Sequence, residues 1–77
     1  SYVVDGSVSI RELNRLLHWR FPVDGPRTLS GLVIEYFEEI PPADICMRIN
    51  DYGLEVVKVQ DNMVKTLRVF PSLTQPE

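Results

Sequence analysis

The sequence predicts a small α+β domain in which two helices cover one face of an antiparallel sheet. Three observations indicate this class: a Tyr- and Val-rich segment at the start, two amphipathic helical patterns after it, and a second half rich in β-branched residues. A chain of 77 residues supports one hydrophobic core. We therefore expect one domain over residues 1–70, followed by a flexible carboxyl-terminal tail over residues 71–77.

Composition argues against several classes of function. Hydrophobic residues make up 44% of the chain and charged residues 25%, which is a globular balance. The net charge of −3 disfavours nucleic acid and anionic membrane surfaces as partners, because both attract Lys and Arg. No apolar run approaches the ~20 residues of a membrane span, so we expect no direct membrane insertion of this segment. Cys46 is a single cysteine and has no internal disulfide partner.

The first strand and the first helix are separated by a short loop. The segment SYVVD predicts the strand, which Asp5 and Gly6 end in a turn. Ser9 begins the helix as a reciprocal capping box, in which its hydroxyl accepts the N–H of Glu12 and the Glu12 carboxylate reaches back. This cap uses N–H groups that a bound anion would need, so we interpret the loop as a turn rather than as an anion or metal site. The apolar face of the helix consists of Ile10, Leu13, Leu16 and Leu17.

The second helix follows the loop FPVDGPR, with Thr28 as its N-cap. Gly31 costs roughly 1 kcal/mol of helix propensity against alanine, which suggests that another backbone comes close at the first turn. Pro41 and Pro42 prevent the helix from continuing. Its apolar stripe consists of Leu29, Leu32, Val33, Tyr36, Phe37 and Ile40. Its carboxylates are typical of a solvated helix face rather than of a metal site: Glu35, Glu38 and Glu39.

The remaining residues predict a three-stranded antiparallel meander over DICMRI, LEVVKVQ and MVKTLRVF. A two-residue turn at Asp61-Asn62 fixes the register of the last two strands. The facing pairs in this register are Val56 with Leu67, Leu54 with Val69 and Glu55 with Arg68.

The outer face of this sheet is predicted to be apolar. Leu54 and Val56 point toward the helices, so strict alternation places three valines on the opposite face. No third helix remains to cover that face. We therefore predict an interaction surface made of Val57, Val59 and Val64, with Glu55 and Arg68 at its rim.

No residue set points to catalysis, a metal or a cofactor. Cys46 and His18 are the candidates for nucleophilic catalysis, and nothing in the sequence brings them together. A zinc site needs about four Cys or His ligands, and no glycine-rich phosphate loop is present. Residues 18–21 form an aromatic run, in which we interpret Trp19 and Phe21 as closing the core rather than stacking on a flavin or a base. Lys58 and Lys65 are either separated by solvent or in contact with an acidic neighbouring domain.

Three stretches in this order resemble the CorC/HlyC-type transporter-associated domain: VVDGSVSIRELNRLL, TLSGLVIEYFEEIP and NDYGLEVVKVQDNMVKTLRV. The resemblance spans residues 2–70. Ser30 and Asp44 depart from it, because the family usually has glycine at both positions. The matched positions are Asp5, Gly6, Leu13, Asn14, Thr28, Leu29, Gly31, Leu32 and Pro41.

This resemblance implies a domain at the carboxyl end of a hemolysin-like membrane protein linked to magnesium and cobalt efflux. It implies a location on the cytoplasmic side of the bacterial inner membrane, where the partners are the preceding CBS pair, the membrane domain or a second copy. It also implies a fold similar to part of a flavin-binding (PCMH-like) domain. We expect a non-enzymatic regulatory and interaction domain, and the alternative is a small-ligand module for FAD or another nucleotide.

Overall fold

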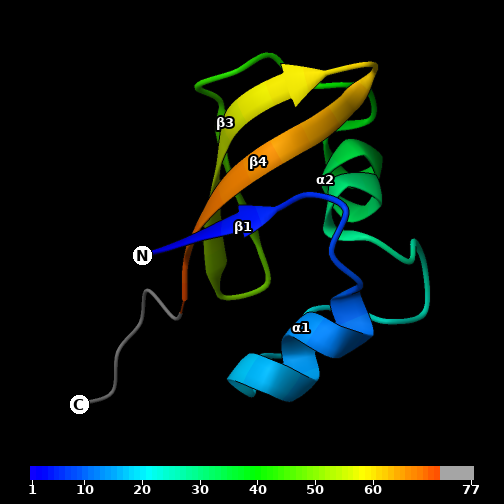
Figure 1. Cartoon of the computed structure of the whole chain (residues 1–77), viewed down its shortest axis with the longest axis vertical. Helices are drawn as coiled ribbons and strands as arrows, with labels where there is room; N and C mark the ends of the chain where they lie inside the picture. The colour runs from blue at the N-terminus through cyan, green and yellow to red at the C-terminus, as the bar shows by residue number, and fades with distance from the viewer. Residues whose placement is uncertain (72–77) are drawn as a thin grey trace.

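The computed structural model describes residues 1–71. Its strands form one antiparallel sheet in the order β1-β4-β3-β2 (Figure 1). The predicted α+β class is confirmed, and β1 extends the meander by pairing with β4. Residues 72–77, which make up most of the predicted tail, lie outside the described residues. The elements are β1 (Tyr2–Asp5), α1 (Ile10–Leu17), α2 (Leu29–Phe37), β2 (Cys46–Ile49), β3 (Tyr52–Gln60) and β4 (Met63–Phe70).

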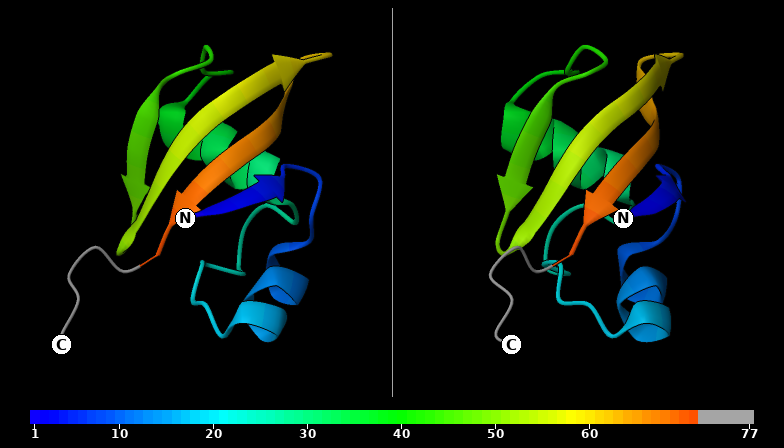
Figure 2. Two further views of the ribbon diagram at one scale, coloured as in Figure 1. Left: turned by 60° about the vertical axis from the view of Figure 1, so that its left-hand side comes forward. Right: turned by 90° about the vertical axis from the view of Figure 1, so that its left-hand side faces the viewer.

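Both helices lie on one side of the sheet, with α2 behind the strands and α1 beyond their lower end (Figure 2). The core between these layers draws its buried side chains from both helices and from β2, β3 and β4. Among the described residues, no helix lies over the opposite face of the sheet. The largest fully buried side chains include Ile10, Leu29, Leu32, Ile49, Leu54 and Leu67.

The β3–β4 hairpin has the predicted pairing. Asp61 and Asn62 both adopt positive φ, 56° and 62°, as a two-residue type I′ turn requires. The three predicted facing pairs are therefore confirmed: Val56 with Leu67, Leu54 with Val69 and Glu55 with Arg68.

The prediction of the outer face is wrong for two of the three valines. Val64 is fully buried, and Val59 is half-buried against the core, whereas Val57 is 37% exposed. The cause is that the ladder between β3 and β4 is irregular at two places. One register shift lies on each side of the pair formed by Lys58 and Thr66. Each strand contains one extra residue at this point, so the alternation of side chains between faces is interrupted while the overall register is kept.

Several element ends depend on residues in the left-handed region. His18 ends α1 with φ 58°, and Glu38 ends α2 with φ 71°, where its N–H donates to the Ile34 carbonyl at 2.8 Å. Asp44 stands where glycine was expected, and it also adopts φ 71° before β2. The turn therefore forms with an aspartate, at the steric cost that a non-glycine residue has in this region.

Replacing Glu38 by glycine should stabilise the domain by about 1 kcal/mol, because glycine adopts positive φ without a Cβ clash. Loss of a negative charge at the helix C-terminus adds a few tenths of a kcal/mol. The matched control is Glu39→Gly, which removes the same charge at a position outside the left-handed region. Urea unfolding should show a gain for Glu38→Gly only, and equal changes in the two variants would contradict this account.

Candidate functional site

The loop after β1 uses its own polar groups internally. The Asp5 carboxylate accepts hydrogen bonds from the backbone N–H and the hydroxyl of Ser7, both at 2.8 Å. These two bonds, with a smaller contribution from the charge of Lys65, lower the pKa of Asp5. The carboxylate therefore closes a local turn of the chain.

The N-termini of both helices are occupied by the protein itself. The Ile10 N–H donates to the Arg27 carbonyl at 2.9 Å, and the Leu29 N–H donates to the Val8 carbonyl at 3.1 Å. These bonds join Ser9 and Thr28, the two N-cap residues, in an isolated β-bridge. The sequence-based interpretation of the loop as a turn agrees with this arrangement, because N–H groups that an anion would use already have partners.

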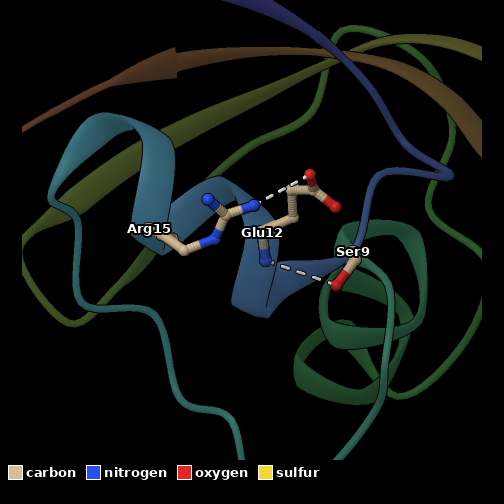
Figure 3. Close-up of polar contacts among 3 residues, drawn as sticks. All are labelled: Ser9, Glu12 and Arg15. Carbon is tan, nitrogen blue, oxygen red and sulfur yellow. Dashed lines mark hydrogen bonds and ion pairs between the residues drawn. The ribbon is translucent and has the colours of Figure 1, made fainter.

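Only half of the predicted capping box is present. The Glu12 N–H donates to the Ser9 hydroxyl at 3.4 Å, as predicted. The Glu12 carboxylate accepts from the Arg15 guanidinium at 3.2 Å and does not reach back to the cap (Figure 3). Both side chains of this ion pair are more than half exposed, so it adds little to stability.

The junction between α2 and β4 depends on Gly6 and Ser30. The Gly6 N–H donates to the Lys65 carbonyl at 2.8 Å, and the Ser30 N–H donates to the Gly6 carbonyl at 2.8 Å. The buried Ser30 hydroxyl accepts from the Val64 N–H at 3.0 Å. A Cβ on Gly6 would lie 1.9 Å from the Val64 carbonyl oxygen. The close backbone approach is therefore at Gly6.

The expectation of a close backbone at Gly31 is wrong. A Cβ at Gly31 would meet the Pro26 side chain at 3.0 Å and the Thr28 hydroxyl at 3.4 Å. The glycine thus makes room for a proline ring and for the N-cap, whose hydroxyl accepts the Gly31 N–H at 3.1 Å.

Replacing Ser30 by alanine should lower the free energy of unfolding by about 1–3 kcal/mol, because it leaves the Val64 N–H buried without an acceptor. The control is Ser7→Ala, which removes an exposed hydroxyl that donates to the Asp5 carboxylate. The Ser7 N–H keeps its own bond to that carboxylate and water can replace the hydroxyl, so this variant should cost less than about 0.5 kcal/mol. Both values come from urea unfolding at pH 7. A cost for Ser30→Ala no larger than that of the control would contradict the role assigned to this hydroxyl.

Trp19 and Phe21, the two aromatic residues that were predicted to close the core, pack on it in the structure. Phe21 is 2% exposed and lies 4.4 Å from the Tyr52 ring, between centroids. Trp19 is half-buried, and its ring centroid lies 5.1 Å from that of Tyr2 and 5.6 Å from that of Tyr52. The Tyr52 hydroxyl accepts the Arg20 N–H at 2.7 Å.

The structure brings no catalytic or metal-binding set together within residues 1–71. No group of three or more His, Cys, Asp or Glu side chains there is arranged to hold a metal ion. Cys46 is exposed on β2, whereas His18 is the C-cap of α1, so the two residues lie on different elements. No helix in the described range is long and apolar enough to cross a membrane.

The open face of the sheet is the most distinctive surface of the described residues, and we call it the outer sheet face. At its centre the Arg68 guanidinium donates to the Glu55 carboxylate at 2.9 Å, so the predicted cross-strand pair is confirmed. Beside this pair is an open hollow of about 300 Å³. The face consists of Val3, Cys46, Arg48, Gly53, Glu55, Arg68 and Phe70, whose partners in the ladder place them on one side.

The described residues form a small α+β domain with one uncovered sheet face, and the comparisons identify its family. Residues 1–72 match the family model for the CorC_HlyC transporter-associated domain, so the chain belongs to this family. It is 42% identical over 71 residues to the UPF0053 inner membrane protein YfjD of Escherichia coli, covering 92% of this chain and 17% of that protein. The chain thus spans about one sixth of that relative's length.

Two solved structures have the same fold. A conserved Haemophilus influenzae protein of unknown function is 33% identical with a TM-score of 0.86, over 90% of this chain and 85% of that chain. The transporter-associated domain of a Xylella fastidiosa hemolysin, solved in complex with Mg²⁺ and Mn²⁺, is 25% identical with a TM-score of 0.77, over 90% and 84%. These two solved chains are little longer than the region that matches this chain.

Proposed function

We propose that this domain is a non-enzymatic regulatory module at the carboxyl end of a membrane ion-transport protein, here called the parent protein. In this proposal it lies on the cytoplasmic side of the inner membrane and modulates the transport of magnesium or cobalt through contacts with adjacent CBS modules. The family description, the inner-membrane relative and the metal-containing hemolysin relative support this assignment.

The two sides of the sheet differ in whether their polar and apolar groups are covered, and this difference is the main support for the proposal. On the helix side, polar groups such as the Ser30 hydroxyl and the Tyr52 hydroxyl are bonded within the domain. On the other side, Val57 is exposed, and the Glu55–Arg68 pair lies at the surface beside the hollow. An uncovered face with apolar and paired polar groups is typical of a docking surface. Val59 and Val64 are no longer part of the proposed surface, because they pack toward the core.

The alternative, a small-ligand module for FAD or another nucleotide, has no supporting feature in residues 1–71. The hollow of about 300 Å³ is at the lower limit for small-molecule sites, and it is open. We expect that FAD at tens of micromolar changes neither the melting temperature of the domain nor the fluorescence of the flavin. A stoichiometric complex with a micromolar Kd would favour the ligand-binding alternative.

The proposal is tested by ion transport in liposomes containing the parent protein with or without residues 1–77. Removing the domain should change the transport rate, or its dependence on ion concentration, several-fold at equal amounts of membrane-inserted protein. The paired substitution Val57→Thr and Arg68→Ala changes an exposed valine of β3 and the arginine at the centre of the outer sheet face. It should reproduce part of this change.

The matched control for that variant is Leu16→Thr with Arg15→Ala. It alters an exposed apolar residue and one arginine of an ion pair on α1. This control should transport ions as the unmodified parent protein does. Unchanged transport after removal of the whole domain would contradict the proposed function.

A further inference from the structure

The outer surface of the sheet is basic, although the chain as a whole is acidic. It carries four of the eight Lys and Arg residues of the chain, which has a net charge of −3. Two of the four lie on the outer sheet face itself, namely Arg48 and Arg68. The other two are Lys58 and Lys65, both exposed where the ladder between β3 and β4 is irregular.

Two carboxylates on this surface, those of Glu55 and Asp5, are already engaged within the domain. Glu55 accepts the hydrogen bond from Arg68, and Asp5 accepts both of its bonds from Ser7. In the described residues, Arg48, Lys58 and Lys65 form no ion pair within 4.0 Å. The surface therefore has positive charge that a partner with carboxylates would complement.

Beside these cations, the hollow offers an apolar contact. It lies where Gly53 has no side chain between its ladder partners Arg48 and Phe70. Phe70 is 36% exposed at its edge, and Cys46 is exposed on the same face. A volume of about 300 Å³ is enough for one large apolar side chain.

We propose that the outer sheet face binds an acidic protein segment that places one apolar side chain in the hollow at Gly53. This inference rests on the proposed function and specifies the chemistry of the partner surface in the parent protein. Carboxylates of that segment lie against Lys58, Lys65 and Arg48, and the apolar side chain packs on Phe70.

A second copy of the chain is a less suitable occupant. Its acidic stretch contains Glu35 on α2 and Glu38, Glu39 and Asp44 after it, without an intervening Lys or Arg. This stretch belongs to α2 and the residues that follow it, and α2 packs on the other side of the sheet. Pairing it with the outer sheet face would join unlike surfaces, and such contacts close into rings or continue as open chains instead of forming a two-fold dimer.

The test is photo-crosslinking in the full parent protein in membranes, with a benzophenone-bearing phenylalanine in place of Phe70. This change is aromatic for aromatic at the edge of the hollow. The matched control carries the same residue in place of Tyr36, which is 49% exposed on α2. Mass spectrometry of the product from position 70 should identify a segment rich in Asp and Glu that contains an apolar residue. The control position should not react with that segment.

A charge variant shows whether the cations select the partner. Lys58→Glu with Lys65→Glu should reduce the crosslink yield roughly tenfold, since two attractions become repulsions at the rim of the contact. Arg11→Glu with Arg20→Glu makes the same charge change on exposed residues of the helix side and should leave the yield unchanged.

Three results would overturn the proposal: a crosslink to a basic or uncharged segment, to a second copy or to lipid; a yield insensitive to the lysine substitutions; or no crosslink at position 70. These outcomes are distinct from failure of the proposed function, because the transport assay responds to removal of the domain whatever the chemistry of its partner.

Discussion

Replacing Gly6 by alanine should lower the free energy of unfolding by about 3 kcal/mol or more, the largest effect expected of a single methyl group in this domain. The added Cβ would lie 1.9 Å from the Val64 carbonyl oxygen, so the backbone of the loop or of β4 has to move. Such a movement weakens the bonds from Gly6 to Lys65 and from Ser30 to Gly6, which connect the loop to β4 and to α2. For a domain of this size, the loss corresponds to a fall in melting temperature of more than ~10 °C.

The matched control for this substitution is Gly25→Ala. The nearest atom to a Cβ at Gly25 is a Glu35 carboxylate oxygen at 3.5 Å, at the flexible end of a side chain. This variant should unfold within about 0.5 kcal/mol of the unmodified domain, or slightly above it through lower entropy of the unfolded chain. Similar melting temperatures for the two alanine variants would contradict the close approach of Gly6 to β4.

Replacing Asn14 by alanine should cost about 2–3 kcal/mol, because one amide satisfies both backbone groups of the buried residue Phe21. The Asn14 Nδ2 donates to the Phe21 carbonyl at 2.9 Å, and the Phe21 N–H donates to the Asn14 Oδ1 at 3.0 Å. The side chain thus pairs with Phe21 as a neighbouring strand would. It fixes the chain that leaves α1 against the aromatic cluster.

The aspartate variant tests this geometry through pH. Asn14→Asp keeps the acceptor for the Phe21 N–H, but an ionised carboxylate faces the Phe21 carbonyl and repels it. The protonated form of that carboxyl donates to the carbonyl, so the folded state raises its pKa above the unfolded value. The variant should therefore gain stability relative to the unmodified domain as the pH falls from 7 to 4, and lose it as the pH rises through the folded pKa.

The control for the pH test is Asn50→Asp, an exposed turn position with φ 56°. Its stability relative to the unmodified domain should depend far less on pH than that of Asn14→Asp. Equal pH dependence in the two variants would show that the Asn14 amide does not pair with Phe21 as described.

Most of the fold was predictable because its signals are local. The N-caps Ser9 and Thr28 mark where the helices begin. The prolines after α2 set only an outer limit for that helix, because it already ends at Phe37 with Glu38 as its C-cap. The turn at Asp61-Asn62 sets the hairpin register, since only a two-residue loop of this kind matches the strand pairing. These features depend on residues close in sequence, so periodicity and turn chemistry were sufficient to predict them.

The errors concern contacts between distant segments. The side chains of residues 56–59, VVKV, are compatible with strict alternation and with a bulge, and only pairing with β4 decides between them. Ser30 lies 34 residues from Val64, and nothing near it in sequence indicates that a strand N–H will need its hydroxyl. The pairing of Glu55 with Arg68 was predicted correctly, but the pair lies at the centre of the outer sheet face and not at its rim. Val59 and Val64 were predicted on the wrong face.

Alkylation of Cys46 shows whether another part of the parent protein covers the outer sheet face. Cys46 is exposed in the isolated domain and lines the hollow on that face. Its reaction rate with a maleimide can be compared between the 77-residue domain and the parent protein with other cysteines replaced by serine. The control is a Cys46→Ser, Tyr36→Cys variant, which reports on the exposed surface of α2. We expect Cys46 to react at least roughly tenfold more slowly in the parent protein, while the control position reacts equally in both. Equal rates for Cys46 in the two proteins would contradict it.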